Sequence, residues 1–303
     1  MRSELHSSWY LFSETMISKG VILAGGQGTR LDPLTRVVSK QLLPVYDKPM
    51  IFYPLALLMR CGIREVLLVT SRDWLPSYRR LLGDGAALGM TIDYAIQENP
   101  VGVPDGLVVA RDWLAGEGCC FILGDNLFFG NLDPLRQAMS LTGGACIFAV
   151  PTREPQRFGI VELGPEGKVL SVEEKPVEPK SDLAIPGVYL FDGSAAWRAG
   201  SLQPSSRGET EICDLMESYR REGLLECRRL GRGFVWLDAG TVEGLLEAGN
   251  FVATMAHRTG FEVACLEEIA WREGWLTDAE LASLAKKQVS KVRREYLEGL
   301  LQP

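Results

Sequence analysis

The sequence predicts an α/β fold with a Rossmann-like, mostly parallel central sheet that is flanked by helices. Short apolar runs at residues 21–24, 65–70 and 119–123 have the length and composition of buried strands. Helix-compatible segments at residues 49–60 and 104–114 lie between them. Strands that alternate with helices at this spacing indicate βαβ units and a parallel sheet covered on both faces. Such sheets bind ligands beyond the carboxyl ends of their strands.

The remaining expected elements fall into three regions: the first half of the chain, a β region that begins at Ala145, and a C-terminal helical region. In the first half we expect a short helix at residues 75–82 and a strand at 91–97. From Ala145 the pattern changes to a smaller β region. Its expected elements are a hairpin of residues 159–163 and 169–174, strands at 184–191, 224–230 and 234–238, and a helix at 211–221. A helix capped by Thr241 follows, and beyond Leu266 the chain is charged and helical through Leu301.

We expect three parts: a flexible extension at residues 1–17, a core at 18–240 and a C-terminal helical segment at 241–303. Within the core, one wall of a cleft comprises residues 18–144 and the other 145–240. The formal net charge of −7 argues against a general binder of nucleic acid or of membrane surfaces. Seven cysteines without a Cys-x-x-Cys pair, together with two histidines, argue against a zinc site and predict a cytoplasmic protein. No apolar run approaches the length of a membrane span.

A glycine-rich loop, Gly25-Gly26-Gln27-Gly28-Thr29-Arg30, follows the first predicted strand. Glycines let backbone N–H groups approach a ligand closely, which is how many loops hold phosphate, and Arg30 adds a fixed positive charge. The loop is not a P-loop, because no Lys-Ser or Lys-Thr follows the glycines. It is not a dinucleotide fingerprint either, since Pro33 opposes an immediate helix. A simple turn stays open as an alternative.

Two acidic residues follow predicted strands in the same way. Asp125 comes directly after the strand at 119–123, and Asp238 ends the strand that begins at Phe234. An aspartate after a strand often serves only as a turn residue or helix cap. Two carboxylates beside a triphosphate, however, supply the hard oxygen ligands that Mg²⁺ prefers.

The ordered string of glycines, Thr29-Arg30, Pro33 and Ser39-Lys-Gln-Leu-Leu-Pro44 resembles the signature of the sugar-nucleotide pyrophosphorylases. Within that family the chain is most similar to the glucose-1-phosphate thymidylyltransferases, from about Lys19 to the C-terminus. The resemblance implies transfer of a thymidylyl group from dTTP to α-D-glucose 1-phosphate, with Mg²⁺ held by Asp125 and Asp238. It implies catalytic roles for Arg30, Lys40, Asp125 and Lys175. It implies nucleotide binding by Leu23, Gly25, Gly26, Gly28, Thr29, Gln41, Gln97 and Gly102.

The same resemblance makes the wall at residues 145–240 the sugar side. It implies substrate binding by Asn126, Gly159, Glu174, Lys175, Gly187, Arg207 and Trp236. Glu267-Glu-Ile-Ala-Trp-Arg272 is similar to a segment that helps form an effector site between subunits in longer relatives. A homotetramer with a dTDP-sugar effector is therefore one expectation, and a helix that only packs on the core or on a partner is the other.

The chain departs from the family pattern near the base and the sugar. Gly102-Val-Pro-Asp-Gly106 stands where Gly-Leu-Ala-Gln-Ala is common, Pro186 replaces a usual threonine, and Asp32 a common histidine. These changes leave another sugar 1-phosphate, another base (UTP or CTP), or a catalytically silent sugar-nucleotide sensor as alternatives. Asp105 is expected either to face the base or, as the simpler role, to sit at the start of a helix.

Overall fold

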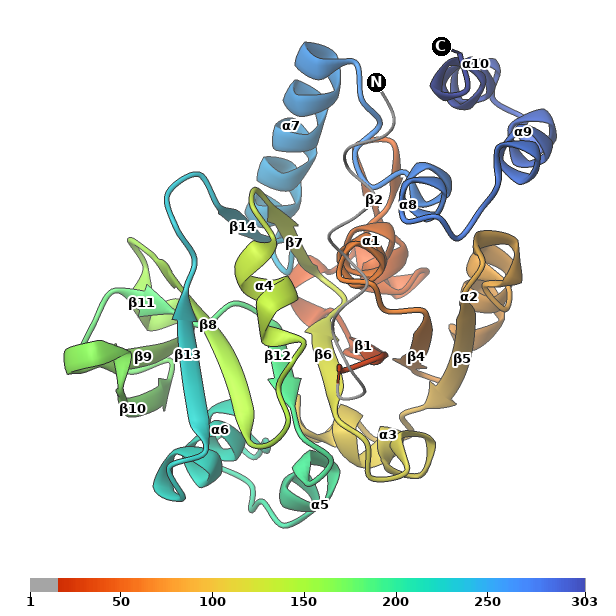
Figure 1. The fold of residues 1–303 in the computed structure, drawn as a ribbon. Coiled ribbons are helices and arrows are strands. Elements are labelled where there is room, and N and C mark those ends of the chain that lie inside the picture. Colours follow the sequence, from red (N-terminus) through yellow and green to blue (C-terminus); the bar gives the residue numbers. More distant parts are fainter. Residues whose placement is uncertain (1–15, 303) are drawn as a thin grey trace.

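The computed structural model describes residues 16–302, and a ten-stranded mixed sheet forms their centre (Figure 1). The strands are β1 (Lys19–Ala24), β4 (Glu65–Thr70), β5 (Thr91–Ile96), β6 (Cys119–Leu123), β8 (Ala145–Pro151), β9 (Gly159–Leu163), β10 (Val169–Glu174), β11 (Leu183–Ala184), β12 (Val188–Phe191) and β13 (Leu225–Arg229). Their order is β10-β9-β11-β8-β12-β6-β1-β4-β5, and β13 pairs with β8. The predicted α/β fold class is confirmed.

Ten α-helices surround this sheet in the described chain. They are α1 (Phe52–Arg60), α2 (Leu75–Leu82), α3 (Asp105–Leu114), α4 (Asp133–Ala138), α5 (Ala195–Gly200), α6 (Ile212–Arg221), α7 (Val242–Thr259), α8 (Leu266–Arg272), α9 (Asp278–Lys287) and α10 (Lys291–Leu300). Two antiparallel strand pairs stand outside the main sheet: β7 (Asn126–Phe129) with β14 (Val235–Asp238), and β2 (Pro44–Val45) with β3 (Lys48–Pro49).

The half of the sheet formed by residues 18–144 is parallel and carries the switch in strand order. β1 pairs in parallel with β4 on one side and with β6 on the other, and β5 pairs in parallel with β4. The chain thus proceeds outward from β1 through β4 to β5 and then returns to the opposite side of β1. Loops that leave such a switch point diverge and open a crevice at the carboxyl ends of the strands. The glycine loop after β1 and the loop after β6 lie at that crevice.

Alternating residues of the central strands bury two separate faces, as expected for a strand period of two. Val21 and Leu67 pack with α3, α5 and α6, whereas Ile22 and Leu68 pack with α1, α4 and α8. A parallel sheet covered on both faces must be apolar on both sides, which explains the continuous apolar runs.

The second half of the sheet is mostly antiparallel. The predicted hairpin has its expected bounds in β9 and β10, which pair with each other. The single strand expected at residues 184–191 is wrong: the chain forms β11 and β12, separated by Ile185, Pro186 and Gly187. Pro186 has no N–H to donate to a ladder, and Gly187 N–H donates instead to Asn126 Oδ1.

The C-terminal helices cover one end of the molecule. Thr241 caps α7 as predicted, with its side chain accepting a hydrogen bond from Gly244 N–H. The helical segment expected beyond Leu266 is confirmed, and it consists of three short helices, α8, α9 and α10. Gly274, at φ 75°, lies between α8 and α9, and Ser290 caps α10. Figure 1 shows α7 standing out from the body, with α8, α9 and α10 grouped apart from it.

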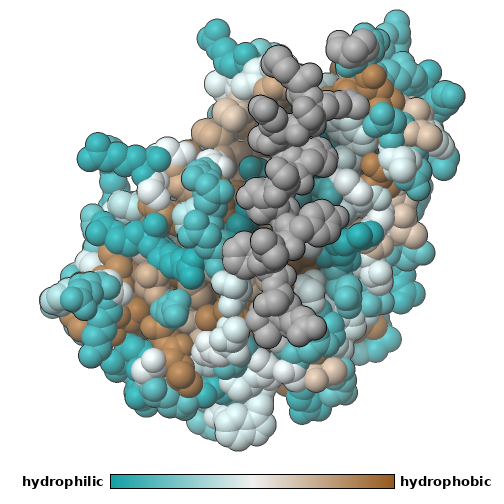
Figure 2. Space-filling model, in the orientation of Figure 1, coloured by the Kyte–Doolittle hydropathy of each residue, from teal (hydrophilic) through white to brown (hydrophobic). Residues whose placement is uncertain are grey.

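The expected N-terminal extension falls almost wholly outside the described residues. Ile17, at its predicted end, is buried in the main core, and its N–H donates to Met139 O. The face in Figure 2 is mostly hydrophilic, with apolar patches between the polar residues. No helix within residues 16–302 is long and apolar enough to cross a membrane.

Candidate active site

Two strand ends meet at the crevice. β14 pairs antiparallel with β7 in a register that sets Asp238 opposite Asn126, the residue after Asp125. Gly240 marks the meeting point: a Cβ atom built there would lie 2.9 Å from Asp238 Oδ1, 3.1 Å from Arg30 Nη2 and 3.2 Å from Asp125 Oδ2. Three charged groups from distant parts of the sequence thus surround one position, and only glycine leaves room between them.

Asp125 is held in its charged form. Its carboxylate forms an ion pair with Lys40 Nζ, and its Oδ1 accepts a hydrogen bond of 3.0 Å from Asn126 Nδ2. Burial opposes ionisation of this group, but the charge and hydrogen bond of Lys40, together with Asn126 and Arg30, lower its pKa below the usual value. Lys40 and Asp125 are both largely buried, so each depends on the other for charge compensation.

Asp238 is in the opposite electrostatic situation. Burial and the nearby charge of Asp125 raise its pKa above the usual value, and Arg30, Lys40 and the Gly240 N–H offset this only in part. The Gly240 N–H donates to Asp238 Oδ1 at 3.0 Å, just before the N-terminus of α7. The Asp238 carboxylate is therefore short of positive charge.

The pair fits a divalent cation that takes most of its ligands from elsewhere. Both aspartates offer hard carboxylate oxygens, and a cation between them would relieve the unfavourable interaction that raises the pKa of Asp238. Residues 16–302 contain no group of three or more His, Cys, Asp or Glu side chains arranged to hold a metal. The donor set thus suits Mg²⁺ whose coordination is completed by phosphate and water, not a closed protein site.

Asn126 orients Asp125 from behind. Its Oδ1 accepts hydrogen bonds from Gly187 N–H at 3.0 Å and from Trp236 Nε1 at 2.6 Å, while its amide nitrogen donates to Asp125. The side chain is buried and uses both ends of its amide within the protein. Three residues predicted to bind substrate, Asn126, Gly187 and Trp236, are thus joined in one network that fixes a carboxylate.

The glycine loop needs glycine at two of its three positions. Gly28 has φ 66°, and a Cβ there would lie 2.8 Å from Thr35 Cγ2. A Cβ at Gly25 would lie 2.1 Å from Gln97 Oε1, whereas Gly26 has nothing within 4 Å. Thr29 and Arg30 begin a short 3₁₀ turn, Thr29–Leu31, and both side chains are exposed. Glycine is therefore required at Gly25 because a neighbouring side chain leaves no room for a Cβ, and at Gly28 for that reason and for its positive φ.

The expected base and ribose contacts are mostly buried. Gln97 follows β5 and donates from Nε2 to Asp105 Oδ2 at 2.6 Å. Gln41 is buried, and its Oε1 accepts from the Ser39 hydroxyl at 3.0 Å. Leu23 O accepts from Gly124 N–H, and Gly102, at φ 142°, bridges to Thr210 on the sugar side. Asp105 is the first residue of α3, as its simpler role predicts, but its carboxylate binds Gln97.

The sugar-side residues form a second, more exposed cluster. Glu174 Oε1 lies 3.6 Å from both Lys175 Nζ and Arg207 Nη2. The Arg207 guanidinium donates two hydrogen bonds to the Glu211 carboxylate, from Nε at 3.0 Å and from Nη2 at 2.6 Å. A Cβ at Gly159 would lie 2.8 Å from Cys213 Sγ of α6, so this glycine leaves room for a thiol of the same wall.

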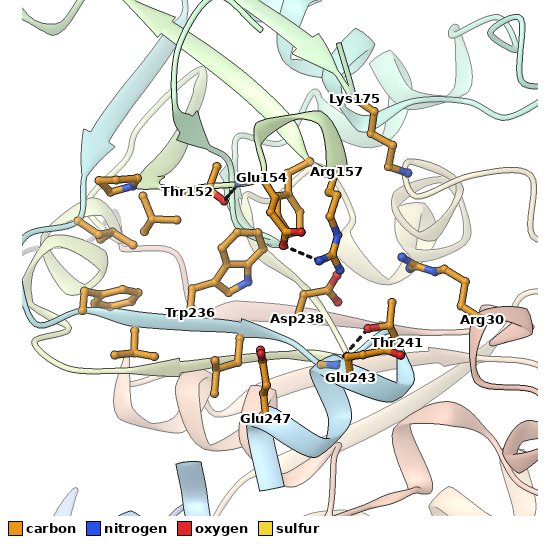
Figure 3. A pocket seen from close by; sticks show the side chains of 18 of the residues that line it. Arg30, Thr152, Glu154, Arg157, Lys175, Trp236, Asp238, Thr241, Glu243 and Glu247 are labelled. Atoms are coloured by element: carbon orange, nitrogen blue, oxygen red, sulfur yellow. Dashed lines mark hydrogen bonds and ion pairs between the residues drawn. The ribbon is translucent and has the colours of Figure 1, made fainter. Parts of the chain in front are cut away.

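A pocket of about 900 Å³ opens between the two walls (Figure 3). Four predicted residues line it: Arg30, Lys175, Trp236 and Asp238. Figure 3 shows the charged ends of Arg30 and Lys175 directed into the same space near Asp238. Sequence reasoning missed other lining residues, namely Thr152, Glu154, Arg157, Phe158, Glu243 and Glu247. Arg157 and Phe158 directly precede Gly159, whose implied role in substrate binding was a signal for them as well. Glu243 and Glu247, one turn apart on α7, follow the recognised cap and were detectable as one helix face.

Comparison with known proteins agrees with this geometry. Residues 19–255 match the family model described as nucleotidyl transferase. The chain belongs to the nucleotidyl transferase family. A glucose-1-phosphate thymidylyltransferase from Neisseria meningitidis serogroup A / serotype 4A is 48% identical over 93% of this chain and 99% of its own length. One from Mycobacterium tuberculosis is 46% identical over 94% and 99%.

Solved structures show the same fold. A Bacillus anthracis protein assigned as a glucose-1-phosphate thymidylyltransferase, in complex with sucrose, is 34% identical with a TM-score of 0.71. The match covers 77% of this chain and 94% of that one. A UDP-glucose pyrophosphorylase complexed with UDP-glucose, 23% identical with a TM-score of 0.70, shares the fold over 79% of this chain and 100% of its own.

Proposed function

We propose that this protein transfers a thymidylyl group from dTTP to α-D-glucose 1-phosphate, giving dTDP-glucose and pyrophosphate. The observation that carries the proposal is the convergence of Arg30, Asp125 and Asp238 around Gly240, at the switch point of the sheet and beside the glycine loop. Relatives that match this chain over nearly their whole length are named glucose-1-phosphate thymidylyltransferases. A purely structural carboxylate pair would not need a cation beside it that lines a pocket and, within residues 16–302, forms no ion pair, as Arg30 does.

The reaction is a single in-line displacement. A phosphate oxygen of the sugar 1-phosphate attacks the α-phosphorus of dTTP, the bond from the α-phosphorus to the bridging oxygen of the β-phosphate breaks, and pyrophosphate leaves with the electron pair. The nucleophile is already anionic, so the protein supplies positioning and positive charge and not a general base. In this proposal Arg30 and the loop of Gly25, Gly26 and Gly28 hold the triphosphate, Lys40 faces the transferred phosphate and Lys175 binds the sugar phosphate.

Mg²⁺ fits the proposed mechanism at Asp125 and Asp238, where it would neutralise charge on the triphosphate. Lys40 keeps Asp125 ionised and in place before nucleotide arrives. Asn126 fixes the rotation of the same carboxylate through Trp236 and Gly187. The nearby positive charges only partly compensate the Asp238 carboxylate, so a bound cation would stabilise its charged form.

The experiment is turnover with a panel of nucleoside triphosphates and sugar 1-phosphates. We expect dTTP to give the highest kcat/KM with glucose 1-phosphate, UTP the second, and CTP and GTP low values. Highest turnover with CTP or GTP, or with a different sugar 1-phosphate, would replace the proposed substrates and keep the reaction type. Tight binding of dTDP-glucose without turnover of any triphosphate would identify a sugar-nucleotide sensor.

We also propose that the protein is a homotetramer inhibited by a dTDP-sugar. Apolar residues of and near α7 support contact with other subunits, since Leu246 is 64% exposed and Phe261 61% exposed. The motif helix α8 packs within the chain: Ala270 lies in the main core, and Glu267 and Glu268 bind Arg293 and Tyr296 of α10. Light scattering tests the tetramer, and a monomer with hyperbolic, uninhibited kinetics would contradict both parts.

A further inference from the structure

The side-chain amide of Gln97 is held from two sides. Gln97 is only 2% exposed, and its Nε2 donates to Asp105 Oδ2 at 2.6 Å. On the other side its Oε1 lies against Gly25, so closely that a Cβ on that residue would be 2.1 Å away. The backbone N–H of Gln97 donates to Thr70 O, which anchors the residue to the end of β4. Neither the backbone nor the amide of Gln97 is free to turn.

Asp105 also determines the orientation of the Gln97 side-chain amide, that is, which of its two atoms is the nitrogen. A carboxylate accepts hydrogen bonds and cannot donate them, so the Gln97 atom that faces it must be the nitrogen. The oxygen must then face Gly25. This oxygen receives no hydrogen bond from any residue within 16–302. An amide oxygen beside the glycine loop that accepts no hydrogen bond from the described residues is available to a ligand N–H.

The orientation of this amide matters for the choice of base. Thymine and uracil present an N–H at ring position 3 beside a carbonyl oxygen, whereas cytosine presents a bare nitrogen beside an amino group. A glutamine amide matches the first pattern in one orientation and the second after a rotation of 180°. A glutamine that is free to rotate would therefore discriminate poorly between the two classes.

We propose that Asp105 is a positioning residue that fixes the amide of Gln97 and so selects thymine and uracil against cytosine. This inference rests on the proposed function, because it takes Gln97 to face the base. Asp105 acts through Gln97 and does not touch the nucleotide. The departure of residues 102–106 from the family pattern then sharpens the preference for dTTP and does not change it.

The test compares three nucleotides in wild type and in Asp105→Asn. The ratio of kcat/KM for dUTP to that for dCTP isolates the hydrogen-bonding edge, because both bases lack the methyl group. The ratio for dTTP to dUTP isolates the methyl group. Asparagine can accept from the Gln97 nitrogen or donate to its oxygen, so it satisfies both orientations. We expect the dUTP/dCTP ratio to fall about tenfold or more and the dTTP/dUTP ratio to stay unchanged.

Two further variants separate this role from a general one. Asp105→Glu keeps an acceptor-only group and should retain most of the dUTP/dCTP discrimination. Asp112→Asn removes an exposed carboxylate of the same helix, 93% exposed at its side chain, and should change neither ratio. Should Asp105→Asn not fold, Asp105→Ser provides the same comparison, and titration calorimetry with dUDP and dCDP gives the ratio without turnover.

An equal fall in kcat/KM for all three nucleotides, with both ratios unchanged, would overturn the proposal and leave Asp105 as a structural residue of α3. A rise in the dUTP/dCTP ratio would also overturn it, because Asp105 would then contact the base directly. A wild type that does not use dTTP would instead refute the proposed function, and the inference with it.

Discussion

The two walls of the crevice hold their charged side chains differently. On the wall of residues 18–144, which we propose binds the nucleotide (the nucleotide wall), the Lys40–Asp125 pair is 11% and 10% exposed, and Gln41 and Gln97 are buried. On the wall of residues 145–240, which we propose binds the sugar phosphate (the sugar wall), Lys175 and Arg207 are 43% and 41% exposed, and each lies 3.6 Å from Glu174. Buried charges depend on their partners far more than exposed ones do. Substitutions on the nucleotide wall should therefore change stability as well as activity, and those on the sugar wall should change mainly activity.

The largest effects are expected at the two strand-end aspartates. Asp125→Asn and Asp238→Asn should each lower kcat/KM by orders of magnitude, because each removes a carboxylate from the proposed Mg²⁺ site. Addition of a chelator should have the same effect on wild type. Full activity in either variant, or in chelator, would exclude that carboxylate from the mechanism.

The same two variants should move stability in opposite directions at pH 7 without nucleotide or metal. The pKa of Asp125 is lowered, so its ionisation favours the folded state above about pH 4, the usual aspartate value, and the contribution is lost as pH falls through the folded pKa. The pKa of Asp238 is raised, so its ionisation disfavours the folded state once the pH exceeds the folded pKa. Tm should therefore fall in Asp125→Asn and rise in Asp238→Asn. A fall of equal size in both would contradict this account.

A comparison of two lysines tests the difference between the walls directly. Lys40→Met leaves Asp125 buried without its partner and should lower the free energy of unfolding by about 3–5 kcal/mol. Lys175→Met removes an exposed charge and should change it by less than about 1 kcal/mol. Both should lower activity, and Lys175→Met should act mainly through KM for the sugar 1-phosphate. Urea denaturation and initial-rate kinetics measure the two effects, and equal destabilisation would remove the distinction.

Local motifs of the site could be predicted from the sequence, whereas contacts between distant segments could not. The glycine loop and both aspartates are motifs of a few consecutive residues at strand ends, so sequence alone predicted that they would meet. The glycine loop and Asp125 follow β1 and β6 of the main sheet, whereas Asp238 comes from β14, which pairs with β7 outside that sheet. The contact between Gln97 and Asp105 was not predictable. It depends on a loop held by the bridge from Gly102 to Thr210, a tertiary contact between the walls.

Other differences had a local signal that sequence reasoning underused. Pro186 cannot donate to a strand ladder, and it marks the break in the strand predicted at residues 184–191. Gly274 and Ser290 are the local signals that mark where the C-terminal helices end and begin. Which face of α7 lines the pocket, by contrast, is set by the packing of Ala248 and Val252 under the helix and could not be read from the cap at Thr241.

The smallest expected effect is at Glu211, which holds Arg207 on the sugar wall. Glu211 accepts from Arg207 Nη2 at 2.6 Å and from the Ser205 hydroxyl at 2.6 Å. Burial raises its pKa, but the hydrogen bonds from Arg207 and Ser205 outweigh this and hold it below the usual value. Glu211→Gln keeps the size of the side chain but removes its negative charge, which weakens its hydrogen bonds with Arg207. We expect KM for glucose 1-phosphate to rise about tenfold, the loss of one charged hydrogen bond, with KM for dTTP unchanged.

Glu217→Gln is the matched control, because Glu217 lies in α6, the helix that Glu211 directly precedes, and pairs with Arg220 and Arg221 instead of Arg207. It should leave both KM values unchanged. The lowered pKa of Glu211 adds a second readout: its ionisation stabilises the fold above about pH 4.3, the usual glutamate value, and this contribution is lost as pH falls. The Tm difference between wild type and Glu211→Gln should therefore shrink toward acid pH. A rise in KM for dTTP as large as that for the sugar phosphate would mean that Arg207 serves both walls, through the bridge between Gly102 and Thr210.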